Sequence, residues 1–257
     1  SVAVLKSLVE RIERNAYISG FERKLKSCTT DRSDGFAAYP VEAATDSKIK
    51  ARQNAHSEAV ERFVWSTWWD DPAIAHEQMS LNSSNTSSAS WGLIEELNKI
   101  IKIKNVTAIV PQISGSNQKT IISFAELENG GFISGGASGP SDEHDITLYR
   151  GLCELVRHGI AIHHFNHSKQ SPKSFYEKRL HFFAFDPGGR ELLQNRLTAG
   201  GTTSIVLPRL AIDEEIPHDL SDLVYVHRCY FENQPPFVGG ELERHLGASL
   251  LDGGDDA

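Results

Sequence analysis

The sequence predicts an α+β fold, because segments with helical periodicity alternate with short extended runs. Apolar residues recur at helical spacing in several segments, whereas 106–110 (VTAIV) and 120–127 (TIISFAEL) read as strands. The chain has 257 residues, 39% of them hydrophobic, which is enough to bury a core without covalent staples. No internal repeat is visible, so one domain over residues 1–257 is the simplest organisation.

The first third of the chain predicts two helices separated by extended residues. Residues 3–15 carry apolar side chains at helical spacing and predict a short amphipathic helix. Residues 17–40 are extended and are broken by the turn-rich sequence DRSDG, which suggests a hairpin around Asp34 and Gly35. A long helix is expected over 41–69, and Pro72 ends or redirects it.

The rest of the chain begins with a polar stretch, 82–90 (NSSNTSSAS), which predicts an exposed loop. A helix over 92–101 and the two strands follow, and the glycine-rich sequence GGFISGGASGPSDEHD leads into a second helix, expected over 145–162. The remaining elements are predicted from their periodicity: helices from Pro172 and over 187–197, strands near 203–207 and 223–231, and a flexible acidic tail over 249–257.

Composition excludes several classes of protein. The formal net charge of −8 argues against broad binding to nucleic acid, which depends on clustered Lys and Arg, but it permits binding of a nucleotide through Mg²⁺. No run approaches the ~20 apolar residues of a membrane span, and no signal peptide is visible. Cys28, Cys153 and Cys229 are widely spaced, which argues against a zinc site built from thiolates and against a disulfide framework. We therefore expect a cytoplasmic protein.

One predicted helix carries a polar face of the kind that binds cations. Asn54, Glu58 and Glu61 stand at i, i+4 and i+7, so at ~100° per residue they line one side of the helix. Two carboxylates on adjacent turns supply the oxygen ligands that Mg²⁺ prefers. Ala55 and Ala59 on another side would allow close packing. The alternative is an ordinary solvated face with both glutamates pointing into water.

A second predicted helix repeats this geometry. Arg150, Glu154 and Arg157 again fall at i, i+4 and i+7. An ion pair within the helix between Arg150 and Glu154 is the structural alternative to a binding role. Upstream, the sequence SGGASG (134–139) could form a loop whose backbone N–H groups approach phosphates at the start of the helix.

Together these two segments resemble the YcaO family. Its first helix typically reads A-R-x-S-A-x-x-E-A-x-E-R, and residues 51–62 (ARQNAHSEAVER) match this pattern, with Asn54 where the family usually has Ser. Its second helix typically reads A-x-x-R-A-L-x-E-x-x-Q after a Gly/Ala-rich loop. Residues 135–137 and 150–157 (RGLCELVR) match it, with Arg157 in place of Gln. The clear match covers about residues 43–64 and 130–165.

The resemblance implies a single YcaO-like domain with mixed or antiparallel sheets, packed helices and an ATP site between helices. In the family, the residues that match Glu58, Glu61 and Glu154 coordinate Mg²⁺ bound to ATP. The residues that match Asn54 and Arg157 contact the nucleotide.

Basic residues of the family's N-terminal strands also contact the phosphates. Lys24, Lys26 and Arg32 lie in the corresponding region, and nothing in the sequence selects one of them. Arg228, in the later strand VHRCYF, is a further candidate for a phosphate contact.

The reaction that the resemblance implies is ATP- and Mg²⁺-dependent activation of a peptide-backbone amide, as in a cyclodehydratase. A nucleophile attacks the amide carbon, and the resulting oxygen takes the γ-phosphate, so that phosphate leaves as an azoline, thioamide or amidine forms. The product belongs to a ribosomally synthesised peptide natural product (RiPP). The nucleophile can belong to the substrate, so the catalytic residues are unknown, and the sequence contains no evident Ser-His-Asp set.

A nucleotide-binding accessory subunit without its own catalysis is the alternative. The chain is short for a YcaO protein. It also lacks the proline-rich PxPxP tail of many azoline-forming members and has only QPPF at 234–237. The implied partners are a precursor peptide and a ThiF-like or TfuA-like protein, with no nucleic acid and no membrane. The aromatic residues Trp65–Trp69 would also suit the interface of a homodimer.

Overall fold

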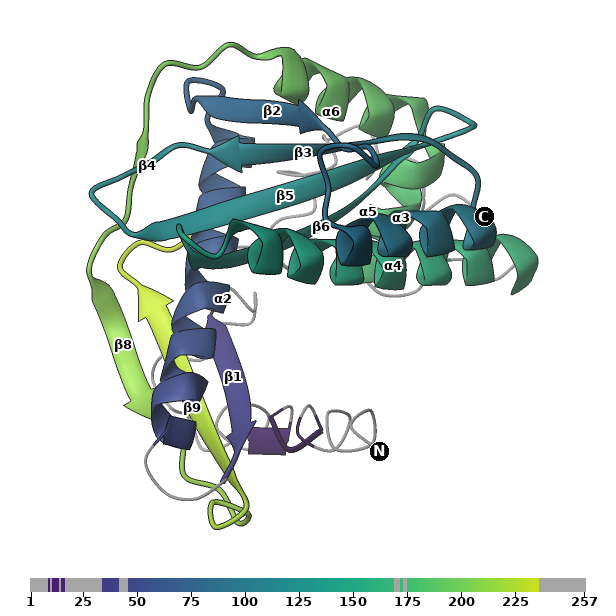
Figure 1. Ribbon diagram of the computed structural model, residues 1–257. Helices are drawn as coiled ribbons and strands as arrows, with labels where there is room; N and C mark the ends of the chain where they lie inside the picture. The colour runs from purple at the N-terminus through teal and green to yellow at the C-terminus, as the bar shows by residue number, and fades with distance from the viewer. Residues whose placement is uncertain are drawn as a thin grey trace, which may run out of the picture. The chain divides into compact units, whose positions relative to one another are not determined.

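The computed structural model describes residues 9, 11–13, 15–16, 34–41, 46–168, 172 and 175–235. They belong to two compact units, the first made of Ser1–Ser66 and Leu207–Phe237 and the second mainly of Thr67–Val206. Helix α2 (Asp46–Asp70) contributes its first part to one unit and its last turn to the other. Each unit has its own sheet (Figure 1), so the expectation of one domain stays a prediction.

The sheet of the first unit has three antiparallel strands in the order β1-β9-β8. These are β1 (Gly35–Pro40), β9 (Val224–Phe231) and β8 (Leu210–Glu215). The helical residues at the N-terminus bury Val9, Ile12 and Ala16 in a core with Phe36 and Val226. The described part of the predicted first helix is therefore confirmed, and its apolar stripe packs against the strands.

Helix α2 packs against β1 almost at backbone contact. A Cβ atom on Gly35 would lie 1.9 Å from the carbonyl oxygen of Ala55 and 2.4 Å from the amide nitrogen of Ala59. Ala55 and Ala59 themselves are fully buried. The prediction that Ala55 and Ala59 allow close packing is therefore confirmed. Their partner on β1 is Gly35, which has no side chain.

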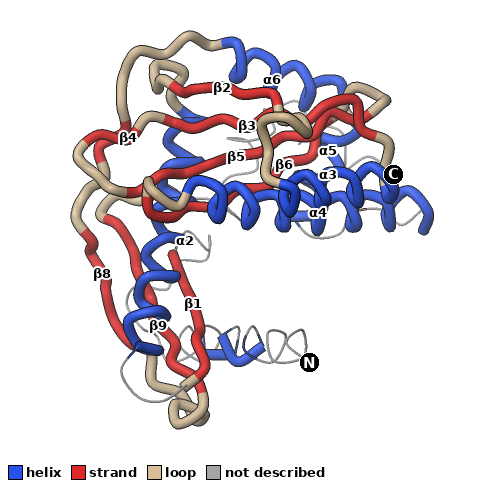
Figure 2. The backbone as a smooth tube through the Cα atoms, in the orientation of Figure 1, coloured by secondary structure: helices blue, strands red, loops and turns tan. Residues whose placement is uncertain are grey.

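The second unit contains a four-stranded antiparallel sheet and a short parallel pair. The large sheet has the order β2-β3-β5-β6 and consists of β2 (His76–Ser80), β3 (Ile103–Pro111), β5 (Gln118–Leu127) and β6 (Phe132–Pro140). The parallel pair joins β4 (Ile113–Ser114) to β7 (Ile205–Val206). Figure 2 distinguishes the strands from the helices by colour, and the predicted α+β class with antiparallel sheets is confirmed.

Four further helices belong to the second unit: α3 (Ser88–Ile100), α4 (His144–Ser168), α5 (Phe175–Phe185) and α6 (Pro187–Thr198). Helices α3 and α4 lie side by side (Figure 1), and Leu97 of α3 and Leu155 of α4 are buried in one cluster with Ile121 of β5. Side-chain caps fix two helix starts, since Ser87 accepts a hydrogen bond at α3 and Asp186 at α6. In the described part of the chain, no helix is long and apolar enough to cross a membrane.

The glycine-rich segment expected to be a loop is strand β6, so that expectation was wrong. Residues 132–140 pair antiparallel with β5 in register along their whole length. A Cβ atom on Gly135 would lie 2.3 Å from the amide nitrogen of Leu155 and 2.5 Å from the carbonyl oxygen of Gly151. The glycines therefore let a strand approach helix α4 closely, which is their other common use beside loops.

Three other expectations differ from the structure. The partner of β1 is β9 and Gly35 lies inside β1, whereas residues 17–33 of the expected hairpin lie outside the described residues. The exposed stretch ends at Ser87, because Ser88–Ser90 already belong to α3. Strand β8 was not predicted. Only Leu210 and Ile212 give the alternation of apolar residues that is typical of a strand, and three acidic residues follow them. The tail at 249–257 lies outside the described residues.

The tryptophan cluster contributes to the core of the second unit. Trp68 is fully buried, and the guanidinium of Arg196 lies 4.1 Å from the centroid of its ring. Arg196 also donates hydrogen bonds to the carbonyl oxygens of Trp68 and Asp71. The Trp68 indole N–H points to Nδ1 of His76 at 3.3 Å, so this nitrogen must carry its lone pair rather than a proton.

His76 makes the stability of the protein depend on pH. Burial, and then the charge of Arg196, lower the pKa of His76 from its ordinary value of 6.5. The folded state therefore binds fewer protons than the unfolded state, so the free energy of unfolding falls as the pH drops through 6.5. We expect urea denaturation to show a smaller loss of stability between pH ~7 and ~5 in His76→Gln than in the wild type. Equal losses in both proteins would contradict this role.

Candidate nucleotide-binding residues

The structure places the predicted site residues on three elements. The helices expected around the two motifs are formed, and the candidates lie as follows: Asn54, Glu58 and Glu61 on α2, Glu154 and Arg157 on α4, and Arg228 on β9. The residues of α2 and β9 belong to the first unit, and those of α4 belong to the second.

Glu58 binds the exposed edge of strand β1. Its Oε2 accepts a hydrogen bond of 2.9 Å from the backbone N–H of Phe36, and its Oε1 accepts one from the guanidinium of Arg62. Arg62 also donates to the carbonyl oxygen of Asp34. Because β1 is an edge strand, its outward N–H groups need partners from outside the sheet. The Glu58 side chain is 30% exposed. It is therefore neither fully solvated, as on an ordinary surface helix, nor inaccessible to a ligand.

Glu154 binds the edge strand of the large sheet in the second unit in the same way. Its Oε2 accepts a hydrogen bond of 2.8 Å from the backbone N–H of Gly136, on the edge strand β6. One turn along the helix, Nδ1 of the buried His158 lies 2.5 Å from the carbonyl oxygen of Ser134. Burial lowers the pKa of His158 and keeps its imidazole neutral. Among the described residues Arg150 makes no ion pair with Glu154, so the expected intrahelical pair is replaced by a contact with the strand.

The carboxylates have the donor chemistry that Mg²⁺ requires. Oε1 of Glu154 lies 3.8 Å from Nε2 of His158, beyond hydrogen-bond distance, while Oε2 is bound to the strand. Asn54 and Glu61 are half-buried and Arg157 is exposed. Carboxylates held by backbone groups keep a fixed orientation, which favours their use as ligands for a hard cation.

Arg228 is in a different environment. Its guanidinium is fully buried and forms an ion pair of 2.5 Å with Asp34, which is also fully buried, and Glu214 lies at 3.8 Å. Side chains alternate along a strand, so Arg228 lies on the opposite face of β9 from His227 and Cys229. A structural ion pair therefore accounts for Arg228. Lys24, Lys26 and Arg32 lie outside the described residues.

The sequence reasoning missed a cluster of Asp213, His227 and Cys229 in the first unit. Hydrogen bonds from the Arg52 side chain are the largest influence that lowers the pKa of Asp213, well below its ordinary value. Burial, and then the charge of Asp213, raise the pKa of the Cys229 thiol to about 12. The only local signal was the spacing of His227 and Cys229, which puts both on one face of a strand. Their carboxylate partner lies on β8, a strand that was not predicted.

Comparisons with known proteins show the fold. No family model matches the sequence, and no curated protein sequence matches it significantly. Two solved structures match, both of the E. coli microcin synthetase McbBCD complex at 11% sequence identity. The first has a TM-score of 0.51 and covers 77% of this chain and 53% of that chain. The second, with pro-MccB17 bound, has a TM-score of 0.54 and covers 80% and 55%.

The class that these observations define is an α+β fold shared with a chain of that complex. The likeness is one of fold, and this chain spans about half the length of the chains that it matches.

Proposed function

We propose that this protein binds ATP with Mg²⁺ and activates a backbone amide oxygen of a ribosomally synthesised peptide by phosphorylation. The product would be an azoline, a thioamide or an amidine, as in cyclodehydratases. The substrate is a precursor peptide, and a ThiF-like or TfuA-like partner protein would present it.

The observation that carries the proposal is the pair of polar helix motifs, with Glu58, Glu61 and Glu154, on this fold. Residues 51–62 and 150–157 match the YcaO pattern in sequence, and both lie in helices. The structural neighbours belong to a microcin synthetase complex, one of them with the peptide pro-MccB17 bound. The two lines of support are independent, because one rests on residue types and the other on the arrangement of elements.

Each residue has a definite part in this proposal. Glu58, Glu61 and Glu154 would hold Mg²⁺, and the exposed Arg157 and the half-buried Asn54 would contact the nucleotide. Bound ATP supplies a phosphoryl group, whose transfer depends mainly on positioning and on neutralisation of charge. The hydrogen bonds from Phe36 and Gly136 orient two of the carboxylates before anything binds. Arg228, whose charge is balanced by Asp34, is left out of this set.

Calorimetric titration of ATP with and without Mg²⁺ tests the site. We expect binding with a dissociation constant of ~1 mM or lower, dependent on Mg²⁺ and abolished in Glu58→Gln and in Glu154→Gln. Glutamine keeps a carbonyl oxygen that can still accept the strand N–H, so the loss would come from the missing charge rather than from an orphaned backbone group.

Glu96→Gln is the matched control. Glu96 lies on α3 in an exposed ion pair with Lys99, and 60% of its side chain is accessible to solvent. This substitution should leave ATP binding unchanged. Wild-type protein that is folded but binds no ATP would overturn the proposal. Equal loss in Glu96→Gln would show that general charge, and not these ligands, governs the binding.

The second candidate is a nucleotide-binding accessory subunit that supports a catalytic partner. Asn54, which stands where the YcaO family usually has Ser, favours this reading. ATP hydrolysis in the presence of a precursor peptide separates the two. Peptide-stimulated hydrolysis by the isolated protein supports catalysis, whereas binding without turnover supports the accessory role.

A further inference from the structure

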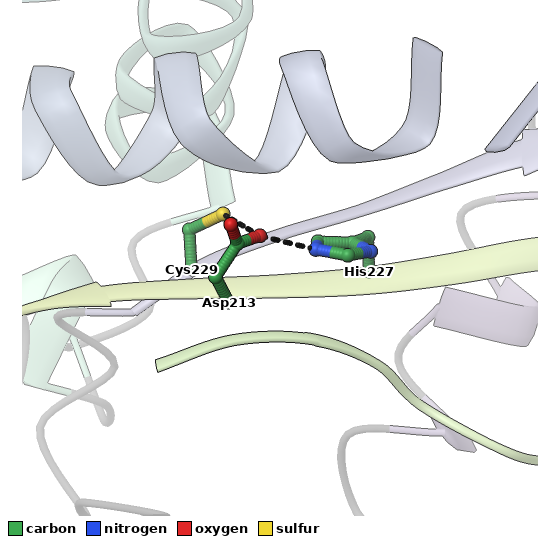
Figure 3. A group of neighbouring side chains, drawn as sticks. All are labelled: Asp213, His227 and Cys229. Carbon is green, nitrogen blue, oxygen red and sulfur yellow. Dashed lines mark hydrogen bonds and ion pairs between the residues drawn. The ribbon is translucent and has the colours of Figure 1, made fainter. Parts of the chain in front are cut away.

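Three side chains with different donor atoms meet on the sheet of the first unit. Asp213 rises from β8, and His227 and Cys229 rise from β9. One ligand atom of each lies within 4.8 Å of the ligand atoms of the other two. Figure 3 shows the three side chains on the same side of the strands, with the Asp213 carboxylate between the imidazole and the sulfur.

The register of the two strands brings these residues together. Asp213 stands directly opposite Cys229, and Glu215 stands opposite His227, so His227 is the diagonal neighbour of Asp213. Residues two apart on a strand share a face, and diagonal neighbours are within reach of long side chains. The convergence is therefore set by backbone pairing and does not depend on a loop.

We propose that Asp213, His227 and Cys229 form a Zn²⁺ site that cross-links β8 to β9. Zinc accepts thiolate, imidazole and carboxylate ligands, and three protein ligands with one water make a common tetrahedral set. The Asp213 Oδ1 atom lies 2.7 Å from His227 Nε2 and 3.7 Å from Cys229 Sγ. Neighbouring ligand atoms around tetrahedral zinc lie ~3.3–3.8 Å apart, given metal–ligand distances of ~2.0–2.3 Å, so only small side-chain shifts are needed.

Oδ1 of Asp213 contacts His227, Cys229 and the Nε–H of Arg52, whereas among these groups only Arg52 contacts Oδ2. Oδ1 faces His227 and Cys229, whereas the terminal nitrogen of Arg52 lies 2.5 Å from Oδ2. Arg52, with 61% of its side chain exposed, can keep this bond while its Nε–H releases Oδ1. A partner that holds the second oxygen of a ligating carboxylate is the usual outer shell of a metal site.

The same geometry disfavours a nucleophilic role for the cysteine. The Cys229 S–H is directed to Asp213 Oδ1, and Nε2 of His227 is bound to that same oxygen. The imidazole is thus engaged by the carboxylate rather than by the sulfur, which is not the arrangement of an activated Cys–His pair. On binding, Zn²⁺ would take the sulfur as thiolate, and the thiol proton would pass to solvent.

The wide spacing of the cysteines does not speak against this site. Widely spaced cysteines make a site of several thiolates improbable, but this site needs only one. The bound ion would connect two strands, because β8 is the outer strand of the sheet order β1-β9-β8 and its three acidic residues are exposed. Its fourth position, filled by water, would stay open to solvent. A metal ion bridging both strands would hold that edge in place.

The test uses the full chain, stripped with a chelator and titrated with Zn²⁺ against a chromophoric competitor. We expect one equivalent to bind with a dissociation constant of ~1 μM or lower, and the melting temperature to rise with Zn²⁺. Co²⁺ in place of Zn²⁺ should show the absorption of tetrahedral coordination with a thiolate ligand. Since loss of an outer partner alone weakens binding ~10–100-fold, Cys229→Ser and His227→Gln should weaken it more than ~100-fold.

Cys153→Ser is the matched control, because Cys153 is also a free cysteine but lies on α4. It should retain both the affinity and the Co²⁺ spectrum. His227→Gln limits the risk of misfolding, because glutamine keeps a polar side chain that can still hydrogen-bond to Asp213 at this largely buried position. Folded wild type without tight Zn²⁺ binding, or unchanged binding in folded Cys229→Ser or His227→Gln, would overturn the proposal. In that case, the cluster is a polar network between strands.

Discussion

Replacing Gly135 by alanine should destabilise the protein by about 3 kcal/mol, because the new methyl group has no room. The Cβ atom would lie 2.3 Å from the amide nitrogen of Leu155 and 2.5 Å from the carbonyl oxygen of Gly151. Both are backbone atoms of α4, so no side-chain rotation relieves the clash, and the helix and β6 must separate. Separation would also lengthen the hydrogen bond from Gly136 to Glu154. Urea denaturation measures the loss.

Gly92→Ala is the control for this prediction. Gly92 lies inside α3, and no heavy atom lies within 4 Å of the Cβ position. Alanine there should stabilise the protein by about 0.5–1 kcal/mol, because it reduces the freedom of the unfolded chain and suits a helix. An effect of Gly135→Ala within ~0.5 kcal/mol of the wild type would show that β6 and α4 are not packed at backbone contact.

Replacing Arg228 by methionine should cost about 3–5 kcal/mol of unfolding free energy. Arg228 and Asp34 are both fully buried and lie 2.5 Å apart, so the change removes the guanidinium from a carboxylate that water cannot reach. The effect should persist in high salt, because a buried pair is screened far less than one in solvent. Thermal and denaturant unfolding at low and high ionic strength measure it.

Arg209→Met provides the comparison within the same unit. The pair between Arg209 and Glu232 has a similar length, 2.5 Å, but Arg209 is 82% exposed, and its loss should cost less than ~1 kcal/mol. The double variant Asp34→Leu/Arg228→Met should recover part of the stability lost in Arg228→Met, since it removes both buried charges. Similar small losses for Arg228→Met and Arg209→Met would contradict the buried pair.

The environment of Arg228 could not be deduced from its sequence alone. Arg228 was a candidate phosphate contact because it is a basic residue in the predicted late strand VHRCYF. Its type and position in the sequence agree with that role, but its burial depends on Asp34, which lies 194 residues earlier. A residue's partner at such a separation cannot be deduced from local pattern, since only the fold decides which distant residues meet.

The two helices that carry the candidate ligands were predicted correctly because the signal is local. Asn54, Glu58 and Glu61 share a helix face through the 3.6-residue period alone, and the same period places Arg150, Glu154 and Arg157. Only the tertiary structure shows that residues of these helices bind the edge strands β1 and β6. Glu58 binds the N–H of Phe36 and Glu154 binds that of Gly136, so these two candidate ligands also bind the outer edges of two sheets.

The sequence by itself determined the α+β class, most helices and the paired acidic motifs, because periodicity and residue type act within a few turns of chain. The tertiary structure decided the role of the glycines at 135 and 136. A strand packed closely on a helix and a phosphate-binding loop are both rich in glycine, so composition does not distinguish them. It also decided that Arg228 forms an ion pair with Asp34, and that Asp213 lies beside His227 and Cys229. These depend on strand register across distant segments, which hydrogen bonding between backbones fixes and local sequence does not.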